Sequence, residues 1–179
     1  MQPDTGSRPK RSDEELKSAA VHLHYEISML FEAVKLAGTA PQPSSLWNAV
    51  LESALVHARV LFDFFDPNPG TRKNLDDVIA ADFFSGGWQG PNWETKVSDL
   101  RSRINKKVAH LSYSRVENEI WELDAFVAPL IGPIRRFLSL VDDRFLDGRW
   151  DSLKAAIATV PPGLGGATCA RGPTGATGP

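Results

Sequence analysis

An arginine and a histidine on one predicted helix are the residues of this sequence that could do chemistry together. Residues 97–111 carry apolar side chains at helical spacing, which predicts a helix with one face packed on a core. Arg103 and His110 are seven residues apart, and roughly 100° of rotation per residue brings them nearly into line on a flank of that helix. A guanidinium and an imidazole on one flank could act on an anion, or the flank could be an ordinary solvated side.

The residues around this pair make the flank mostly basic. Lys96 and Lys107 lie on or beside it, together with Asp99, and Tyr113 follows the predicted helix end, where it could position a ligand. His110 also has a simple structural interpretation, because a histidine at a helix end can interact with the last carbonyl groups and the negative end of the dipole. Residue types alone leave both interpretations open.

The other histidines make a weaker case for a metal site. His22 and Glu26 are four residues apart on the first predicted helix, and His57 borders the apolar face of the second. Carboxylate-bridged sites in helical bundles use paired Glu-x-x-His motifs, and the sequence has none. The single cysteine, Cys169, excludes a multi-cysteine site. We therefore expect no metal and no cofactor, and interpret His57 as a hydrogen-bonded residue at the core edge.

Composition restricts the class of protein. The chain has 179 residues, 42% of them hydrophobic, which is enough for one core of ordinary size. Its 20 Lys and Arg against 22 Asp and Glu give a net charge of −2, so any basic site has to be local. The charged first residues do not resemble a secretory signal, and no apolar stretch is long enough to span a membrane. With one cysteine, this pattern predicts a cytoplasmic protein without a membrane partner.

Helix signals begin near the start of the chain, and no segment alternates like a strand. Ser12 and Glu15 have the form of a capping box, which starts a first helix of about 25 residues. A second helix begins at Ser44 or Ser45 and ends at the proline-rich residues 66–70. The third is the helix that carries Arg103.

The later elements are less regular. We expect three aromatic side chains in the loop over residues 71–92 to seal the edge of the core. A fourth helix keeps its apolar spacing over residues 116–145, and its prolines should kink or split it near residue 132. Asp151 could cap a short last helix over residues 152–159.

Together these elements predict an all-α protein, an up-and-down four-helix bundle with a short extra C-terminal helix. The bundle domain occupies residues 12–160. We expect residues 1–11, which hold charges and helix breakers but no apolar run, to be disordered. Residues 161–179 are rich in glycine and proline and should form a disordered tail.

The Arg-(six residues)-His arrangement of Arg103 and His110, on the third long helix of such a bundle, is similar to the Arg-(four to six residues)-His motif of HEPN domains. Two further stretches carry the resemblance, residues 51–59 before the pair Phe64-Phe65, and residues 76–84. Together they resemble a group of bacterial HEPN-like proteins over residues 44–125.

The resemblance implies a compact helical domain that forms a homodimer across the motif helices. Many HEPN domains are metal-independent RNases in toxin–antitoxin, abortive-infection or CRISPR-linked systems, and others are non-catalytic binding modules. It implies Arg103 and His110 as the site, RNA as the substrate and an antitoxin-like protein as a partner. This chain differs at Ile104, because a polar residue usually follows the arginine.

Metal-free RNA cleavage needs the 2′-hydroxyl to lose a proton while it attacks the phosphate, and the leaving 5′-oxygen to gain one. His110 could serve either step, since an unperturbed imidazole has a pKa of roughly 6.5. Arg103 could donate two directed hydrogen bonds to phosphate oxygens. A two-fold related copy would double this pair and line the cleft with Lys96 and Lys107.

Three interpretations compete. The first is a dimeric, metal-independent ribonuclease of a toxin or phage-defence type that uses Arg103 and His110. The second is a non-catalytic HEPN-like module that binds a nucleotide, an RNA or a protein through the same cleft, which Ile104 favours. The third is a structural helical adaptor, which predicts that this flank is exposed and unpaired.

Overall fold

The computed structural model describes residues 8–41, 44–66, 75–91, 93, 95–109 and 121–159. Every regular element within these ranges is helical, which confirms the all-α prediction. The α-helices are α1 (Asp13–Ala37), α2 (Ser45–Phe64), α3 (Thr95–Ile104), α4 (Leu123–Leu140) and α5 (Arg149–Thr159). The shorter elements are the 3-10 helices η2 (Ala80–Phe83) and η5 (Asp143–Phe145), and the π-helical η3 (Asn105–Ala109), which continues α3.

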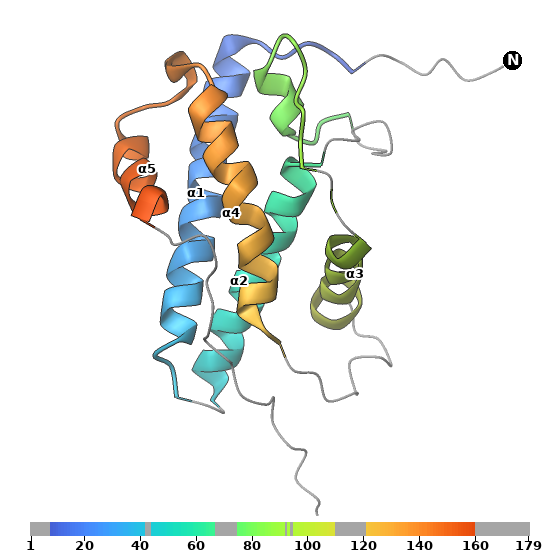
Figure 1. Cartoon of the computed structure of the whole chain (residues 1–179), viewed down its shortest axis with the longest axis vertical. Coiled ribbons are helices and arrows are strands. Elements are labelled where there is room, and N and C mark those ends of the chain that lie inside the picture. The colour runs from blue at the N-terminus through green and yellow to red at the C-terminus, as the bar shows by residue number, and fades with distance from the viewer. Residues whose placement is uncertain are drawn as a thin grey trace, which may run out of the picture.

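Three long helices form the centre of the molecule. Figure 1 shows α1, α2 and α4 side by side along its long axis, and α2 packs against both α1 and α4. α5 covers the outside of α1 and α4, and the shorter α3 packs on α2 and α4. The finer prediction of an up-and-down four-helix bundle stays a prediction. In the described part of the chain, no helix is long and apolar enough to cross a membrane.

An apolar core fills the space between these helices, and no polar or charged residue among those described is buried in it. At one end of the core, Phe137 of α4 meets a group of aromatic rings with centroids 5.3–6.1 Å away. Those rings belong to Phe64, Phe65, Phe83, Phe84 and Trp88. The last three come from the loop before α3, which confirms that its aromatic side chains seal the core edge.

The predicted start signals of the first two helices are confirmed. The Ser12 side chain accepts a hydrogen bond from the Glu15 backbone N–H at 3.2 Å, and the Glu15 carboxylate accepts one from the Ser12 N–H at 2.8 Å. This backbone hydrogen bond is the main reason that the pKa of Glu15 lies below its ordinary value. Ser44 caps α2 by accepting from the Trp47 N–H at 3.0 Å.

Two predictions about the C-terminal half are wrong in detail. α4 is one helix through Pro129 and Pro133, so of the two predicted outcomes, a kink or a split near residue 132, the split is wrong and the kink stays a prediction. The helix ends at Leu140 rather than at residue 145. Its continuous buried face outweighs the two missing backbone donors, because most helical stability in proteins comes from packing. α5 starts at Arg149, so Asp151 lies in its first turn and does not precede it as a cap, and the Asp147 side chain accepts a hydrogen bond from the Arg149 N–H at 3.0 Å.

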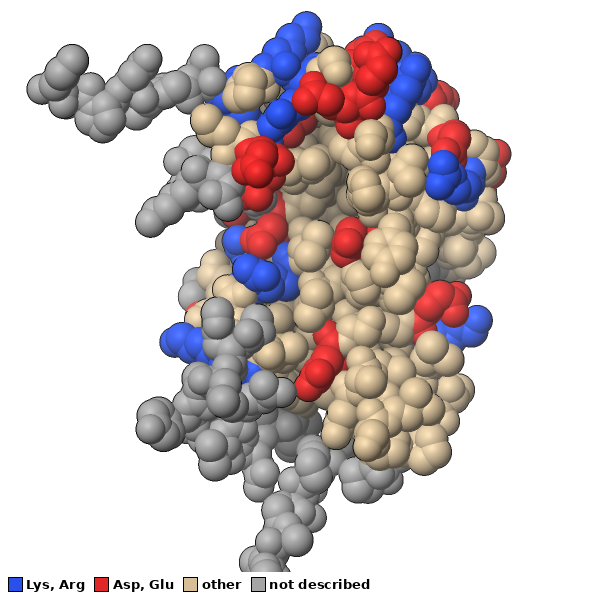
Figure 2. All heavy atoms as spheres, turned by 180° about the vertical axis from the view of Figure 1, so that it is seen from behind, with Lys and Arg blue, Asp and Glu red and all other residues tan. Residues whose placement is uncertain are grey.

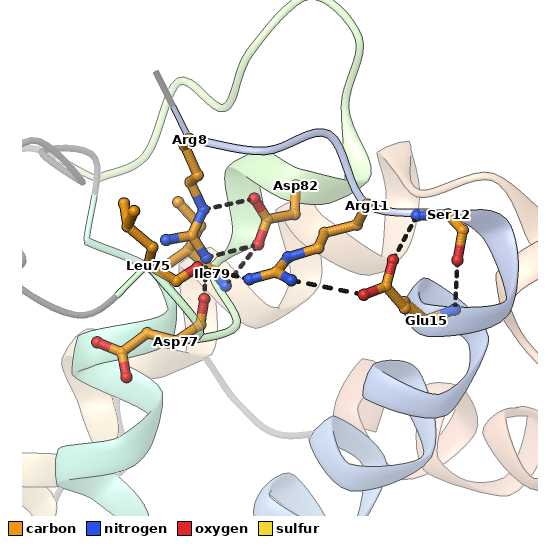
Figure 3. A network of polar contacts seen from close by, with 8 residues as sticks. All are labelled: Arg8, Arg11, Ser12, Glu15, Leu75, Asp77, Ile79 and Asp82. Atoms are coloured by element: carbon orange, nitrogen blue, oxygen red, sulfur yellow. Dashed lines mark hydrogen bonds and ion pairs between the residues drawn. The ribbon is translucent and has the colours of Figure 1, made fainter. Parts of the chain in front are cut away.

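Residues 8–11, which the sequence predicts to be disordered, form a strap across the loop before η2 (Figure 3). Arg8 donates two hydrogen bonds to the Asp82 carboxylate, at 2.9 and 3.0 Å, and a third to a backbone carbonyl of the same loop. Arg11 donates to the Leu75 carbonyl. The hydrogen bond with Asp82 raises the pKa of Arg8 above its ordinary value. Hydrogen bonds from Arg8 and Arg11 hold this strap in place. The prediction of disorder considered only apolar anchoring, so it did not detect these polar contacts.

Asp82 also organises the loop that the strap holds. Its carboxylate accepts a hydrogen bond from the Ile79 N–H at 3.2 Å, which starts η2. Residues 75–77 therefore form a turn within the predicted loop, and a 3-10 helix follows at residues 80–83. Residues 160–179, with the predicted tail, lie outside the described residues.

Candidate functional site

The orientation of α3 is set by its buried apolar residues and by one arginine. Ile104 is fully buried, at 0% exposure, and two other apolar residues of α3 are buried with it. Arg101 forms ion pairs with Asp63 and Asp66 at the end of α2, and the second has a distance of 3.0 Å between Nη1 and Oδ2. These contacts determine which side of α3 remains at the surface.

Arg101 is a residue that local pattern does not single out. Asp63 and Asp66 are three residues apart on and just after α2, close to one helical turn, so their carboxylates can share one cation. Which cation they share depends on where α3 packs. The sequence shows two carboxylates at a helix end, which indicates that a cation binds there. Only the fold shows that this cation is Arg101.

Arg103 lies at the seam between α3 and the start of α4. Its guanidinium carbon is 5.3 Å from the centre of the Trp121 ring and 5.9 Å from that of Phe126, within the range of cation–π contacts. The side chain is half-buried. A guanidinium held beside aromatic rings has its N–H donors in one plane, which is the geometry that suits phosphate, while neighbouring rings can stack on bases.

Lys107 of the predicted flank is described, and its neighbour Lys106, which the sequence did not single out, is described with it. Lys106 is exposed and Lys107 is half-buried, and both belong to η3. We call Arg103, Lys106 and Lys107 the α3 flank. Lys96 belongs to α3, but its side chain is outside the described part, as are His110 and Tyr113 altogether. The pairing of Arg103 with His110 therefore stays a prediction.

The π-helical η3 changes the spacing argument for this pair. The predicted alignment of Arg103 with His110 assumes an α-helix with roughly 100° of rotation per residue. Residues 105–109 are π-helical instead, and the wider i→i+5 turn rotates each residue through a smaller angle. The alignment does not follow from the sequence separation. Single π-helical turns inside α-helices occur frequently at functional sites.

A second polar cluster joins α1 to α2. His57 Nδ1 and Glu26 Oε2 are 2.6 Å apart, and the His57 side chain is only 12% exposed. The Tyr25 ring meets the imidazole edge-on, with the ring centres 5.7 Å apart. This confirms His57 as a hydrogen-bonded residue at the core edge. Within the described ranges, no three His, Cys, Asp or Glu side chains come together as a metal site would require.

Comparison with known proteins adds no relative from which a function could be transferred. No family model, no curated protein and no solved structure matches the chain.

Proposed function

We propose that this chain is a HEPN-like protein that binds and cleaves RNA at the α3 flank without a metal ion. The observation that carries this proposal is the position of Arg103, half-buried against Trp121 and Phe126 at the edge of the bundle. Phosphate recognition by the guanidinium and base stacking on a neighbouring ring are the two contacts that single-stranded RNA needs most. Toxin or phage-defence activity in the cytoplasm is part of this proposal.

The proposed fold is an up-and-down four-helix bundle made of α1, α2, α3 and α4, with α5 as the extra C-terminal helix. Its support is the packing of α2 against α1 and α4, and of α3 against α2 and α4. The fixed orientation of α3, with Ile104 inward and Arg101 bound to α2, leaves the α3 flank as the outer edge of this bundle.

In the proposed mechanism, Arg103 binds the scissile phosphate and stabilises the negative charge that grows on it during attack by the 2′-hydroxyl. His110 transfers the proton, either from the 2′-hydroxyl or to the leaving 5′-oxygen. Lys107, with Lys96 and Tyr113, contacts the RNA beside the cleavage position. All charge stabilisation comes from fixed cations, so the reaction needs no metal.

A homodimer through the helix that carries Arg103 and His110 completes this proposal. One pair is a small active site, and a two-fold axis near α3 would place two pairs in one basic cleft. An antitoxin-like protein that covers this cleft is the partner expected in a toxin system. Sedimentation of the wild type and of Lys107→Glu tests the dimer. The substitution changes the charge by −2 in each copy, so a two-fold interface near α3 would collect a change of −4 and the dimer should dissociate. A monomeric wild type would contradict it.

Complete burial of Ile104 favours a second candidate, a non-catalytic module that binds RNA, a nucleotide or a protein at the same flank. HEPN motifs usually carry a polar residue after the arginine, and a side chain with 0% exposure cannot take part in chemistry at a surface cleft. This candidate predicts that Arg103 contributes to binding and that the wild type does not cleave RNA.

The deciding experiment measures cleavage of a labelled single-stranded RNA in EDTA, together with RNA binding by fluorescence anisotropy. For the ribonuclease, His110→Ala should lower the rate about 10²–10⁴-fold and Arg103→Ala about 10²–10³-fold. Arg103→Lys should recover only part of the loss, because lysine lacks the planar fork. Lys35→Ala, an exposed cation at the far end of α1, is the control.

The outcomes separate the two candidates once circular dichroism shows that all variants are folded. Cleavage in EDTA that both motif substitutions remove supports the ribonuclease. Binding without cleavage, weakened by Arg103→Ala and unchanged by Lys35→Ala, supports the module. Neither binding nor cleavage by the wild type would contradict both and favour the structural adaptor.

A further inference from the structure

Trp121, just before α4, is a half-buried tryptophan that the sequence pattern does not single out. It precedes the N-cap residue Glu122, and its ring packs against that of Phe126, the fourth residue of the helix, with the ring centres 5.5 Å apart. This is the arrangement of a hydrophobic staple, which fixes the direction in which the chain enters a helix. Phe126 is only 1% exposed, so the staple holds Trp121 on a packed part of the core.

The Trp121 ring is not fully enclosed by its neighbours. Arg103 lies over it, with 5.3 Å between the guanidinium carbon and the ring centre. Among the described residues, nothing accepts a hydrogen bond from the Trp121 indole N–H, and this N–H is not buried, in contrast to that of Trp93. Part of the ring, including its N–H edge, is therefore accessible to a ligand that also contacts Arg103.

The charges around the ring are divided between two helices. On one side, the three cations of the α3 flank outnumber Asp99, which is exposed one turn before Arg103. On the other side, the start of α4 has two carboxylates, the exposed Glu122 and the half-buried Asp124. A polyanion is attracted to the first side and repelled by the second. Its charged backbone therefore runs along α3 and η3, and the groups that project toward Trp121 have to be uncharged.

The side formed by α1 and α2 does not offer this combination. Figure 2 shows it from behind as a mainly uncharged surface, on which most Lys and Arg side chains lie next to Asp or Glu. Lys35 of α1, for example, pairs with Glu32 at 3.8 Å. A phosphate at such a pair meets a carboxylate together with the cation, so this side attracts an RNA strand less than the α3 flank does.

We infer that Trp121 is the ring on which an unpaired RNA base stacks, so that the site accepts single-stranded and rejects double-stranded RNA. The inference rests on the proposed function, because it names the substrate class of the same site. A phosphate lies at Arg103 and a base at Trp121, and these groups are close enough for the base to belong to the same nucleotide or to its neighbour. In a duplex every base is paired and stacked, so none can reach the ring.

The test measures binding of a fluorescein-labelled RNA strand of about 12 nucleotides, a length within the usual range of single-strand sites. Its sugars are 2′-O-methylated, because a strand without 2′-hydroxyls cannot be cleaved by their attack on the phosphate. The same strand annealed to its complement is the double-stranded probe. The wild type should bind the single strand at least about tenfold more tightly than the duplex. Fluorescence anisotropy measures both dissociation constants.

Two substitutions of Trp121 separate stacking from the staple. Leucine and phenylalanine can both pack against Phe126, but only phenylalanine offers a flat ring to a base. Trp121→Leu should weaken binding of the single strand about 5- to 150-fold, the range expected for loss of one stacking ring. Trp121→Phe should weaken it about threefold or less. Circular dichroism checks that both variants are folded.

Intrinsic fluorescence locates the stacked base at one tryptophan. The single strand should quench the tryptophan fluorescence of the wild type, and Trp121→Phe should remove this quenching. Trp93→Phe is the matched control, because Trp93 is also half-buried but packs on Phe62 of α2, with the ring centres 5.4 Å apart. It should leave the quenching in place.

Salt dependence separates a stacking ring from a ring that only positions Arg103. Stacking releases no counterions, so the slope of log Kd against log salt concentration should be the same for Trp121→Leu and the wild type. Arg103→Ala should reduce the slope by about 0.7, the value for one phosphate contact on a single strand. The reduced slope in Trp121→Leu would overturn the stacking role.

The outcomes distinguish this inference from the proposed function. Equal affinity for single strand and duplex, equal effects of Trp121→Leu and Trp121→Phe, or quenching that Trp93→Phe alone removes would each overturn the inference. The proposed function would survive these results if Arg103→Ala still weakened RNA binding. No binding of either RNA by the wild type would overturn both.

Discussion

Ile104 and Arg103 are neighbours in sequence with opposite environments. Ile104 is fully enclosed by the core, whereas Arg103 is half-buried beside aromatic rings at the surface. Successive helical residues differ by roughly 100° in direction, so fixing one of them fixes the other. The position of the guanidinium thus depends on how well the isoleucine packs.

Replacing Ile104 with alanine should lower the free energy of unfolding by about 2–5 kcal/mol, because it removes buried methyl groups and leaves a cavity. Urea denaturation measures this. Leu140→Ala, at an exposed position, should change stability by less than about 0.5 kcal/mol. Similar losses in the two variants would show that α3 does not pack on the core as described.

Glu15→Gln should destabilise the protein at neutral pH but not in acid. The Ser12 N–H favours the ionised carboxylate, so the pKa of Glu15 is lower in the folded than in the unfolded chain. Its contribution is therefore complete above the ordinary pKa of 4.5 and is lost as the pH falls through the lowered value. Thermal unfolding at several pH values should show the difference from wild type closing in acid.

Glu14→Gln is the control for that measurement. Glu14 lies in the same first turn of α1 and interacts with the same helix dipole, but the capping bonds use Glu15. A difference that persists unchanged below the pKa range, or that Glu14→Gln reproduces in full, would contradict the capping argument.

Residue-level prediction from sequence succeeds where the cause is local. Ser12, Glu15 and Ser44 form hydrogen bonds with backbone groups three residues away. Both partners therefore lie within one short stretch of sequence, where the capping pattern can be recognised. The environment of Arg103 is different, because Trp121 and Phe126 reach it only through the packing of α4 against α3. Sequence spacing could identify Arg103 as a candidate but could not identify these neighbours.

At the scale of elements, α3 is attached to the rest of the molecule by its buried apolar side chains, by the ring contacts of Arg103 and by the ion pairs of Arg101. Arg101→Ala should lower the free energy of unfolding by about 1 kcal/mol, a modest value because the ion pairs with Asp63 and Asp66 are partly exposed. Amide exchange should become faster in residues 95–104 and stay unchanged in α1. Native-state hydrogen exchange checks this directly.

Arg149→Ala serves as the control for Arg101→Ala. Arg149 also pairs with a carboxylate, but its partner Asp147 is two residues away in the same turn. The control should leave exchange in α3 unchanged. Equal exchange in α3 for both variants would contradict the role of Arg101 as the connection between α3 and α2.

Two elements differ from local expectation for reasons that sequence rules do not contain. α4 continues through Pro129 and Pro133 because its buried face outweighs the missing donors. Residues 105–109 have the composition of an ordinary helix, yet they are π-helical. The starts of α1 and α2 were predicted correctly from their caps, whereas the bounds of α4 and α5 and the geometry within a helix depend on what each helix packs against.

At the scale of the whole molecule, the two surfaces of interest have different chemistry. The α3 flank carries cations beside aromatic rings, whereas the groove between α1, α2 and the loop with Val78 is lined by apolar side chains and by carboxylates that face cations or an imidazole. The net charge of −2 conceals this division.

The strap contributes to global stability because it joins the start of α1 to the loop after α2. Arg8→Ala should lower the free energy of unfolding by about 1–2 kcal/mol, since it removes charge-assisted hydrogen bonds to a carboxylate that is only 8% exposed. Lys10→Ala, an exposed neighbour in the strap, should have little effect. Urea denaturation distinguishes the two, and equal stability of both variants would contradict this role.

The strap also has a consequence for the order of folding. Arg8 and Asp82 are 74 residues apart, whereas α1 and α2 are joined by a short connection and can meet at a small cost in loop entropy. The α1–α2 hairpin should therefore form before the transition state, and the strap after it. In stopped-flow experiments Arg8→Ala should increase the unfolding rate and leave the refolding rate unchanged. The strap therefore slows unfolding of the native protein but does not take part in the transition state for folding.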